Sequence, residues 1–299
     1  MLTGVDDPVI TSAANPRLRS LIALRRRRVR EAVGSTLVEG YEELSMALDA
    51  GVVPSAAYVC PQLFSPAGRA GSQDIGVQED LVAELHRLGV HVIRLSRPAF
   101  EKVAYREGPD GLIAVVDNVV RRLDDLTVGA GGGPSSPAPA PPALIVLCQG
   151  IEKPGNLGAM LRTADAAGAD AVIAADPVTD WGNPNVVRAS KGTVFAVPVA
   201  SARTLETLTW LRDNHIALVV STPDTDVVYT DVDYTGPVAI AVGAEKHGAD
   251  DVLLTAAAER VRIPMAGRAN SLNVAASTAI LLYEAVRQRQ PREPLPFRP

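Results

Sequence analysis

The sequence has few aromatic residues and only two cysteines. Aromatic residues make up 4% of the 299 residues, whereas 47% of the residues are hydrophobic. This balance allows a substantial core and favours helices packed on a sheet over an aromatic-rich β-sandwich or a disordered chain. Cys60 and Cys148 lie in apolar segments far apart in the sequence, so they predict a reducing cytoplasm rather than a disulfide framework.

Long apolar runs and ligand clusters are also missing. No stretch of about 18 uninterrupted apolar residues occurs, so no membrane span is expected. The N-terminus carries Asp6 and Asp7 instead of the apolar run of a signal peptide. None of the four histidines has a second ligand at the spacing of a zinc site. No GxGxxG or Walker pattern follows a predicted strand. We therefore expect a cytoplasmic protein that uses neither a metal nor a dinucleotide.

Acidic residues are absent from residues 17–30, although the net charge of the whole chain is −5. This segment, RLRSLIALRRRRVR, holds seven arginines, and the helical spacing of its apolar residues predicts one amphipathic helix over about 16–31. The arginines either form a solvated face, pair with an acidic neighbour or contact phosphates. We favour phosphate contacts, because the guanidinium fork fits phosphate oxygens. The residues predicted to make them are Arg25, Arg26, Arg27 and Arg28.

A segment without charged residues divides the chain. Residues 129–142, GAGGGPSSPAPAPP, predict a linker between two parts. The N-terminal part is predicted to be a small α/β domain, with a surface loop over residues 61–76. Its helices are expected at about 16–31, 40–50 and 78–88, and its strands at AAYVC, HVIRL and GLIAVVD.

The C-terminal part alternates strands and helices more regularly. Strands are expected at 143–149, 171–175, 194–200, 216–221, 237–242 and 260–265. Helices are expected at about 157–167, 203–213, 250–257 and 271–289. Apolar strands alternating with helices predict a parallel sheet that is covered on both faces. Ligands of such sheets bind beyond the carboxyl ends of the strands.

Three loops beyond these strands carry unusual polar residues. QGIEKPGNLGAMLRTADAAGAD contains Asn156 and Arg162, AVGAEKHGADD contains Glu245, and AGRANSLNV contains Ser271 and Asn273. Each has a purely structural interpretation as well. Asn156 and Ser271 are plausible helix caps, Arg162 fits a solvent-facing position, and the glycines around Glu245 fit a tight turn.

Taken in order, the three loops resemble the three motifs of the SpoU (TrmH-type) family of RNA ribose 2′-O-methyltransferases, within the SPOUT superfamily. The matching patterns are N-x-G-x-x-x-R, G-x-E-x-x-G and I-P-M-x-G-x-x-x-S-L-N-V. The resemblance covers residues 143–290 and extends into the N-terminal part, which looks like the family's L30e-like substrate-binding domain. It implies an RNA-binding domain over 9–120, a linker over 121–142, a methyltransferase domain over 143–290 and a tail over 291–299.

The resemblance also implies a fold and a chemistry. Members of the family fold the C-terminal chain into a trefoil knot, bind S-adenosylmethionine there and act as homodimers whose sites draw on both subunits. By position, the implied catalytic residues are Arg162, Asn156, Glu245, Ser271 and Asn273, with Glu245 expected to fix Arg162 by a charge-assisted bond. The implied cofactor-binding residues are Thr222, Gly243, Ile263 and Leu272.

The substrate is expected to be RNA, because the acceptor is a ribose 2′-hydroxyl. The two-domain layout resembles the enzymes that act on ribosomal RNA, most of all that of the large subunit, so the phosphate-contacting arginines are expected to bind RNA. A tRNA methyltransferase and a non-catalytic RNA-binding protein of the same fold are the alternatives.

Overall fold

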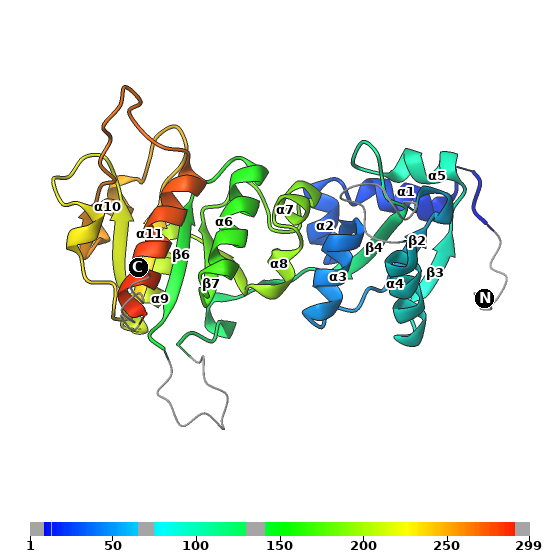
Figure 1. The fold of residues 1–299 in the computed structure, drawn as a ribbon, viewed down its shortest axis with the longest axis horizontal. Coiled ribbons are helices and arrows are strands. Elements are labelled where there is room, and N and C mark those ends of the chain that lie inside the picture. Colours follow the sequence, from blue (N-terminus) through cyan, green and yellow to red (C-terminus); the bar gives the residue numbers. More distant parts are fainter. Residues whose placement is uncertain (1–8, 13, 65–74, 130–140, 291–299) are drawn as a thin grey trace, which may run out of the picture. The chain divides into compact units, whose positions relative to one another are not determined.

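The computed structural model describes residues 9–12, 14–64, 75–129 and 141–290. The chain forms two compact units (Figure 1). The N-terminal unit comprises Met1–Val119 and Asp180–Ala196, and the C-terminal unit comprises Val120–Thr179 and Val197–Pro299. Most of the predicted linker and surface loop, at 130–140 and 65–74, and the predicted tail at 291–299 lie outside the described residues.

The N-terminal unit contains a four-stranded mixed sheet in the order β1-β4-β2-β3. Its strands are β1 (Ser35–Glu39), β2 (Ala56–Val59), β3 (His91–Arg94) and β4 (Leu112–Asp117). Strand β4 runs antiparallel to β1 and β2, and β3 runs parallel to β2. The helices that follow these strands are α3 (Tyr41–Asp49), α4 (Ile75–Arg87) and α5 (Arg97–Val103). Strands β2, β3 and β4 were predicted, whereas β1 was not.

The predicted single helix over 16–31 is wrong, because the basic segment forms two helices. They are α1 (Pro16–Ala23) and α2 (Arg27–Val33), and Arg26 between them has an extended backbone. Helix α1 buries Leu18 and Leu21 in the core of the unit. The break leaves the Leu24 and Arg25 carbonyls free of a helical partner, and both accept hydrogen bonds from the buried guanidinium of Arg30. Apolar periodicity alone does not show such a break.

A segment of the later sequence completes the N-terminal unit. Residues Asp180–Ala196 form α7 (Pro184–Ala189) and α8 (Thr193–Ala196), which pack on β1 and α3. The strand expected at 194–200 therefore begins later, as β8 (Val199–Ala202). Gly192, directly before α8, has φ +81° and lies against Met46 and Glu43 of α3 with no room for a side chain.

The C-terminal unit contains a seven-stranded sheet in the order β11-β9-β10-β6-β7-β8-β5. All its neighbouring strands run parallel, which confirms the prediction of a parallel sheet. The remaining strands are β5 (Val120–Arg121), β6 (Leu144–Gln149), β7 (Ala171–Ala175), β9 (Ala217–Ser221), β10 (Val238–Val242) and β11 (Glu259–Val261). The range expected as a linker, 121–142, begins inside strand β5 and contains the short 3-10 helix η2 (Leu123–Asp125).

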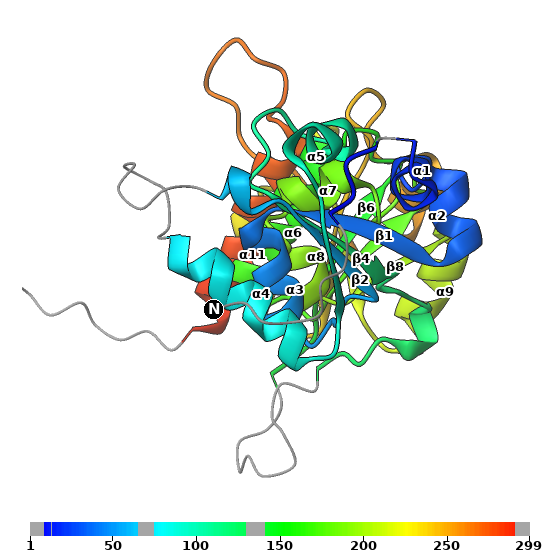
Figure 2. The ribbon, with the colours of Figure 1, turned by 90° about the vertical axis from the view of Figure 1, so that its right-hand side faces the viewer.

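Helices cover both faces of this sheet, as expected. Helices α6 (Pro154–Ala166) and α11 (Val274–Arg289) pack together on one face. Helices α9 (Thr204–Asp213) and α10 (Asp251–Ala256) pack on the other, where Trp210 and Leu253 join the core. Figure 2 shows α6 and α11 on one side of β6 and α9 on the other. Among the described residues, no helix has both the length and the apolar character needed to cross a membrane.

Candidate active site

The three loops singled out in the sequence leave the carboxyl ends of strands in the C-terminal unit. The first joins β6 to α6, the second joins β10 to α10, and the third joins β11 to α11. Strands β6 and β10 are adjacent, and β9 lies between β10 and β11. Parallel strands end at one edge of the sheet, so the three loops lie at the edge where ligands of such folds bind.

A chain of side-chain hydrogen bonds joins the three loops. Asn273 Nδ2 donates to Asn156 Oδ1 at 3.1 Å, and Asn156 Nδ2 donates to Glu245 Oε1 at 2.8 Å. Each amide therefore has one orientation. Its nitrogen points to the next residue in the order Asn273, Asn156, Glu245. The structure brings together three of the predicted site residues, one from each loop.

Glu245 accepts further hydrogen bonds from the first loop. The backbone N–H groups of Glu152 and Lys153 lie 3.3 and 3.4 Å from its two carboxylate oxygens. Burial by itself raises the pKa of Glu245, but the hydrogen bonds from Asn156 and from the backbone outweigh this effect, so its pKa is lower than the ordinary value. The carboxylate is therefore ionised near neutral pH and ties the second loop to the first.

Glycine is required at position 243 by the closure of the second loop. A Cβ atom at Gly243 would lie 2.0 Å from the backbone of Gly248 and Ala249. The loop is closed by paired backbone hydrogen bonds of 2.9 and 2.8 Å between Ala244 and Gly248. This closure directs the Glu245 side chain towards Asn156 without a mobile hinge at the end of β10.

Neither of the expected helix caps, Asn156 and Ser271, is the N-cap of its helix. Asn273 is the N-cap of α11, and its Oδ1 accepts a 2.9 Å hydrogen bond from the N–H of Ala275. Asn156 lies inside the first turn of α6, whose N-cap is Lys153. The Oδ1 atom of Asn273 therefore caps α11. The Asn156 side chain caps no helix and instead links Asn273 to Glu245 by hydrogen bonds.

Within one chain, Arg162 does not join the cluster formed by Asn273, Asn156 and Glu245. It lies six residues after Asn156 on α6, which turns it by about 120° to another side of the helix. Its side chain is exposed. The expected bond from Glu245 is absent, since the described residues provide Arg162 with no hydrogen bond or ion pair.

The other predicted residues of the site differ in burial. Thr222, directly after β9, is buried, and its hydroxyl accepts a 3.2 Å hydrogen bond from the N–H of Asp224. Ile263 is half-buried, whereas Ser271 and Leu272 are exposed at the start of α11. Along 263–272 the described residues show no backbone hydrogen bonds, so the N–H and C=O groups of this loop are available to a ligand.

The sequence analysis missed Gln149, the last residue of β6. This buried amide donates to Thr204 Oγ1 at 2.9 Å and accepts from the N–H of Asp250 at 2.9 Å. The Thr204 hydroxyl in turn donates to Asp176 at 2.6 Å. Gln149 thereby fixes the start of α10 and the loop before it. The sequence signal that could have identified Gln149 was its place as a polar residue at the end of the apolar run ALIVLC.

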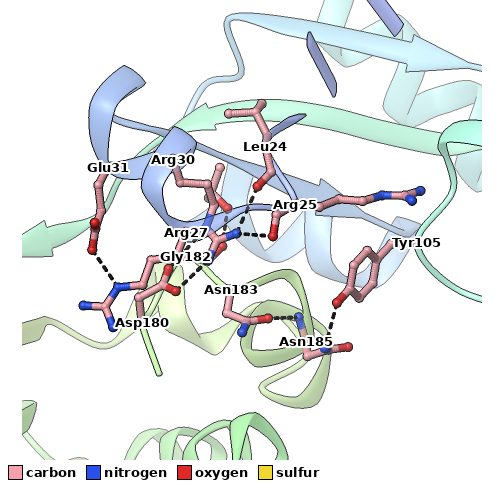
Figure 3. A network of polar contacts seen from close by, with 11 residues as sticks. Leu24, Arg25, Arg27, Arg30, Glu31, Tyr105, Asp180, Gly182, Asn183 and Asn185 are labelled. Carbon is pink, nitrogen blue, oxygen red and sulfur yellow. Dashed lines mark hydrogen bonds and ion pairs between the residues drawn. The ribbon is translucent and has the colours of Figure 1, made fainter. Parts of the chain in front are cut away.

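The predicted phosphate-contacting arginines lie in the N-terminal unit and have different surroundings (Figure 3). Arg25 is half-buried and donates to the carbonyls of Val103 and Ala104 at 2.9 and 2.8 Å. Arg27 forms a 2.7 Å ion pair with Glu31. Arg26 and Arg28 are exposed and have no partner among the described residues. Of the four, these two are the best placed to contact a ligand.

In the described part of the chain, no group of three or more His, Cys, Asp or Glu side chains is arranged to hold a metal ion. The side chains that join the three loops by hydrogen bonds are two amides and one carboxylate, and the third loop adds free backbone groups. This set suits hydrogen bonding to an organic ligand.

The chain is similar to known proteins over both units. The model of the SpoU rRNA Methylase family matches residues 143–283, and that of the MRM3-like substrate binding domain matches residues 15–114. The 23S rRNA (guanosine-2'-O-)-methyltransferase RlmB of Ralstonia nicotianae is 32% identical over 71% of this chain and 82% of its own length.

Two further relatives match nearly the whole chain. The 23S rRNA (uridine(2479)-2'-O)-methyltransferase of Streptomyces viridochromogenes is 30% identical over 91% of this chain and 88% of its own length. The crystal structure of an AdoMet-bound rRNA methyltransferase from Sinorhizobium meliloti has a TM-score of 0.78 and 30% identity, and the match covers 94% of this chain and 97% of that chain.

Proposed function

Because this chain belongs to the SpoU rRNA methylase family, we propose that it transfers a methyl group from S-adenosylmethionine to a ribose 2′-hydroxyl of 23S ribosomal RNA. The observation that carries the proposal is the row of side-chain hydrogen bonds from Asn273 through Asn156 to Glu245. These bonds join all three loops at the edge of the sheet where ligands of such folds bind. The names of the relatives, which specify 23S rRNA, support the substrate class.

The residues present fit S-adenosylmethionine. The free backbone groups along 263–272 suit the edge of an adenine, and Ile263 and Leu272 offer apolar surface to its ring. Thr222 and the tightly closed loop after Gly243 would border the same ligand. When bound, S-adenosylmethionine supplies a sulfonium methyl group that is already activated for transfer, so the protein has to provide alignment and stabilisation of charge.

The polar side chains would orient the ribose. Asn156 and Asn273 each retain unused hydrogen-bonding capacity beside the fixed Glu245, and the Ser271 hydroxyl is exposed next to them. Arg162 would hold the target phosphate and stabilise the developing alkoxide, because a guanidinium keeps its protons in proteins and is therefore a poor base.

Since Arg162 stands apart from the cluster of its own chain, we propose that it serves the site of a partner subunit in a homodimer. The Arg162 guanidinium is exposed, has no partner among the described residues and lies about 120° around α6 from Asn156, which supports this arrangement. The trefoil knot expected in the C-terminal unit stays a prediction.

The proposal is tested by mapping ribose methylation on total RNA from cells with and without the protein. One 2′-O-methylated position in 23S rRNA that disappears with the gene and returns with the unchanged protein is expected. An unchanged 23S rRNA map, with the missing methyl group in tRNA, would reassign the substrate. No difference in any RNA would reject the function.

A further inference from the structure

Tyr105 of the N-terminal unit is an exposed tyrosine that is held from three directions. It follows α5, and 38% of its surface is exposed. Its backbone N–H donates to Glu39 at 2.7 Å, and its hydroxyl accepts from Asn185 Nδ2 at 3.0 Å. The guanidinium carbon of Arg25 lies 5.5 Å from the centre of its ring, within the range of a cation–π contact (Figure 3).

The groups that hold Tyr105 are themselves fixed. Arg25 is bound to two backbone carbonyls, those of Val103 and Ala104. Asn185 donates its backbone N–H to Asn183 Oδ1 at 3.0 Å, and its own Oδ1 accepts from Arg188 at 3.1 Å. The position and tilt of the ring are therefore set before any ligand arrives.

Part of this support comes from the segment Asp180–Ala196. Asp180 forms an ion pair with the buried Arg30, with distances of 3.2 and 2.6 Å to its two carboxylate oxygens. The Thr36 hydroxyl donates to the carbonyl of Gly182. These contacts anchor the beginning of the segment, shortly before Asn185, to α2 and β1. The Tyr105 ring thus depends on residues that lie far apart in the sequence.

Packing does not account for this arrangement. Tyr58 of the same unit is 6% exposed and belongs to the core, whereas Tyr105 lies outside that core. A single exposed aromatic residue is ordinary, because proteins cannot cover all their apolar surface. A ring that is exposed, contacted by an arginine and an amide, and carried on a backbone held by a carboxylate is organised to present its surface.

We propose that Tyr105 is a stacking platform for an unpaired base of the substrate RNA. Proteins that read RNA stack unstacked bases on aromatic rings and on arginine planes, and here the two occur together. Two exposed arginines lie on the segments that hold the platform, Arg26 next to Arg25 in the sequence and Arg188 bound to Asn185, and they favour a polyanionic ligand over an apolar peptide. The proposal rests on the proposed function, since it takes RNA as the ligand.

The test compares Tyr105→Leu with Tyr105→Phe in the full chain. The probe is a labelled oligoadenylate of about twelve nucleotides, with an RNA duplex of the same length as the second ligand. Leucine keeps apolar surface but removes the ring, so binding of the oligoadenylate is expected to weaken by roughly 5- to 150-fold. Phenylalanine loses only the Asn185 bond and should stay within about threefold of the unchanged protein.

Two further readouts identify stacking as the cause. The slope of log K against log salt should be the same for both variants and the unchanged protein, because Tyr105 carries no charge. Binding of the duplex, whose bases are already stacked, should not change. Thermal unfolding of each variant shows whether the unit is intact, and Asn185→Ala provides a matched variant that removes the same bond as Tyr105→Phe.

A folded Tyr105→Leu variant that binds oligoadenylate as tightly as the unchanged protein would overturn the proposal. An equal loss for the duplex would also overturn it. Methyl transfer to rRNA by the unchanged protein is a separate measurement, so the platform and the proposed function can fail independently.

Discussion

Asn156 Nδ2 lies 2.8 Å from Glu245 Oε1, although 89 residues separate the two in the sequence. This contact joins the loop after β6 to the loop after β10, and Asn273 extends it to the start of α11. The amide and the carboxylate fix one another, because Asn156 has one donor aimed at the carboxylate and Glu245 is ionised near neutral pH. The arrangement orders the candidate site before a ligand binds.

The pH dependence of stability should report the Glu245 carboxylate. Its pKa in the folded protein is below its ordinary value of 4.5, so the stability that it contributes is fully present above about pH 4.5 and is lost as the pH falls through the folded pKa. Glu245→Gln removes the titrating group. The difference in unfolding temperature between the two proteins should be constant from about pH 5 to 7 and shrink at lower pH. A difference that grows on acidification would contradict the assigned direction.

Mixed dimers should test whether Arg162 serves the partner's site. Arg162→Ala and Asn156→Ala are each expected to abolish methyl transfer, and Arg162→Ala should retain affinity for S-adenosylmethionine because it serves the RNA. After the two variants are unfolded and refolded together, half of the dimers would be mixed, and each would hold one complete site. Roughly a quarter of the unchanged activity should return.

The control for this experiment is the same mixture without refolding, which should stay inactive. An inactive refolded mixture that contains mixed dimers would show that Arg162 acts in its own subunit. Asn214→Ala is a matched asparagine control, because its side chain only donates to the Trp210 carbonyl at the end of α9. It should leave methyl transfer unchanged.

The arginines of residues 17–30 should separate into binding and structural groups. Arg26→Gln and Arg28→Gln together should reduce the slope of log K against log salt by about 1.4 to 1.8 for RNA, since each lost phosphate contact removes about 0.7 to 0.9. Unfolding temperature should hardly change, because both side chains are exposed. Filter binding over a range of salt concentrations measures the slope.

Arg30→Gln should behave in the opposite way. It removes the partner of Asp180 and the donor to the Leu24 and Arg25 carbonyls. Because Asp180 keeps 19% of its side chain exposed, the cost is expected to lie below the about 3–5 kcal/mol of a fully buried pair. A large fall in unfolding temperature is expected.

The outcome for Arg26 and Arg28 can contradict their predicted role. If the folded double variant Arg26→Gln with Arg28→Gln shows an unchanged slope of log K against log salt, these arginines form a solvated face.

The sequence predicted the elements whose pattern is local. The apolar runs at 143–149 and 171–175 appear as β6 and β7, because parallel strands buried on both faces contain no polar alternation. Helix α7 was missed, although Asn183 followed by Pro184 is a recognisable helix start. The break between α1 and α2 was not predictable from periodicity, because the carbonyls that it frees are bound by Arg30 within the folded unit.

The sequence indicated residues of the candidate site but not the hydrogen bonds between them, and the functional roles of these residues stay predictions. The motif order identified Asn156, Glu245 and Asn273, yet a bond such as that between Asn273 and Asn156 joins residues 117 positions apart. The spacing of residues along the sequence holds no information on such distances, and the bond expected between Glu245 and Arg162 does not form within one chain. The support of Tyr105 by Asn185 was missed for the same reason.

The most direct test of the account is the chemical position of the transferred methyl group and its dependence on Asn156. Purified protein, S-adenosylmethionine with a radiolabelled methyl group and 23S rRNA lacking the modification are incubated, and the RNA is digested with alkali. A 2′-O-methylated ribose blocks cleavage at its own phosphodiester, so the label should appear in an alkali-stable dinucleotide. Asn156→Asp, which places a second carboxylate against Glu245, should lower the rate by about 10- to 100-fold. Label recovered in single nucleotides, or an Asn156→Asp variant with the unchanged rate, would contradict the account.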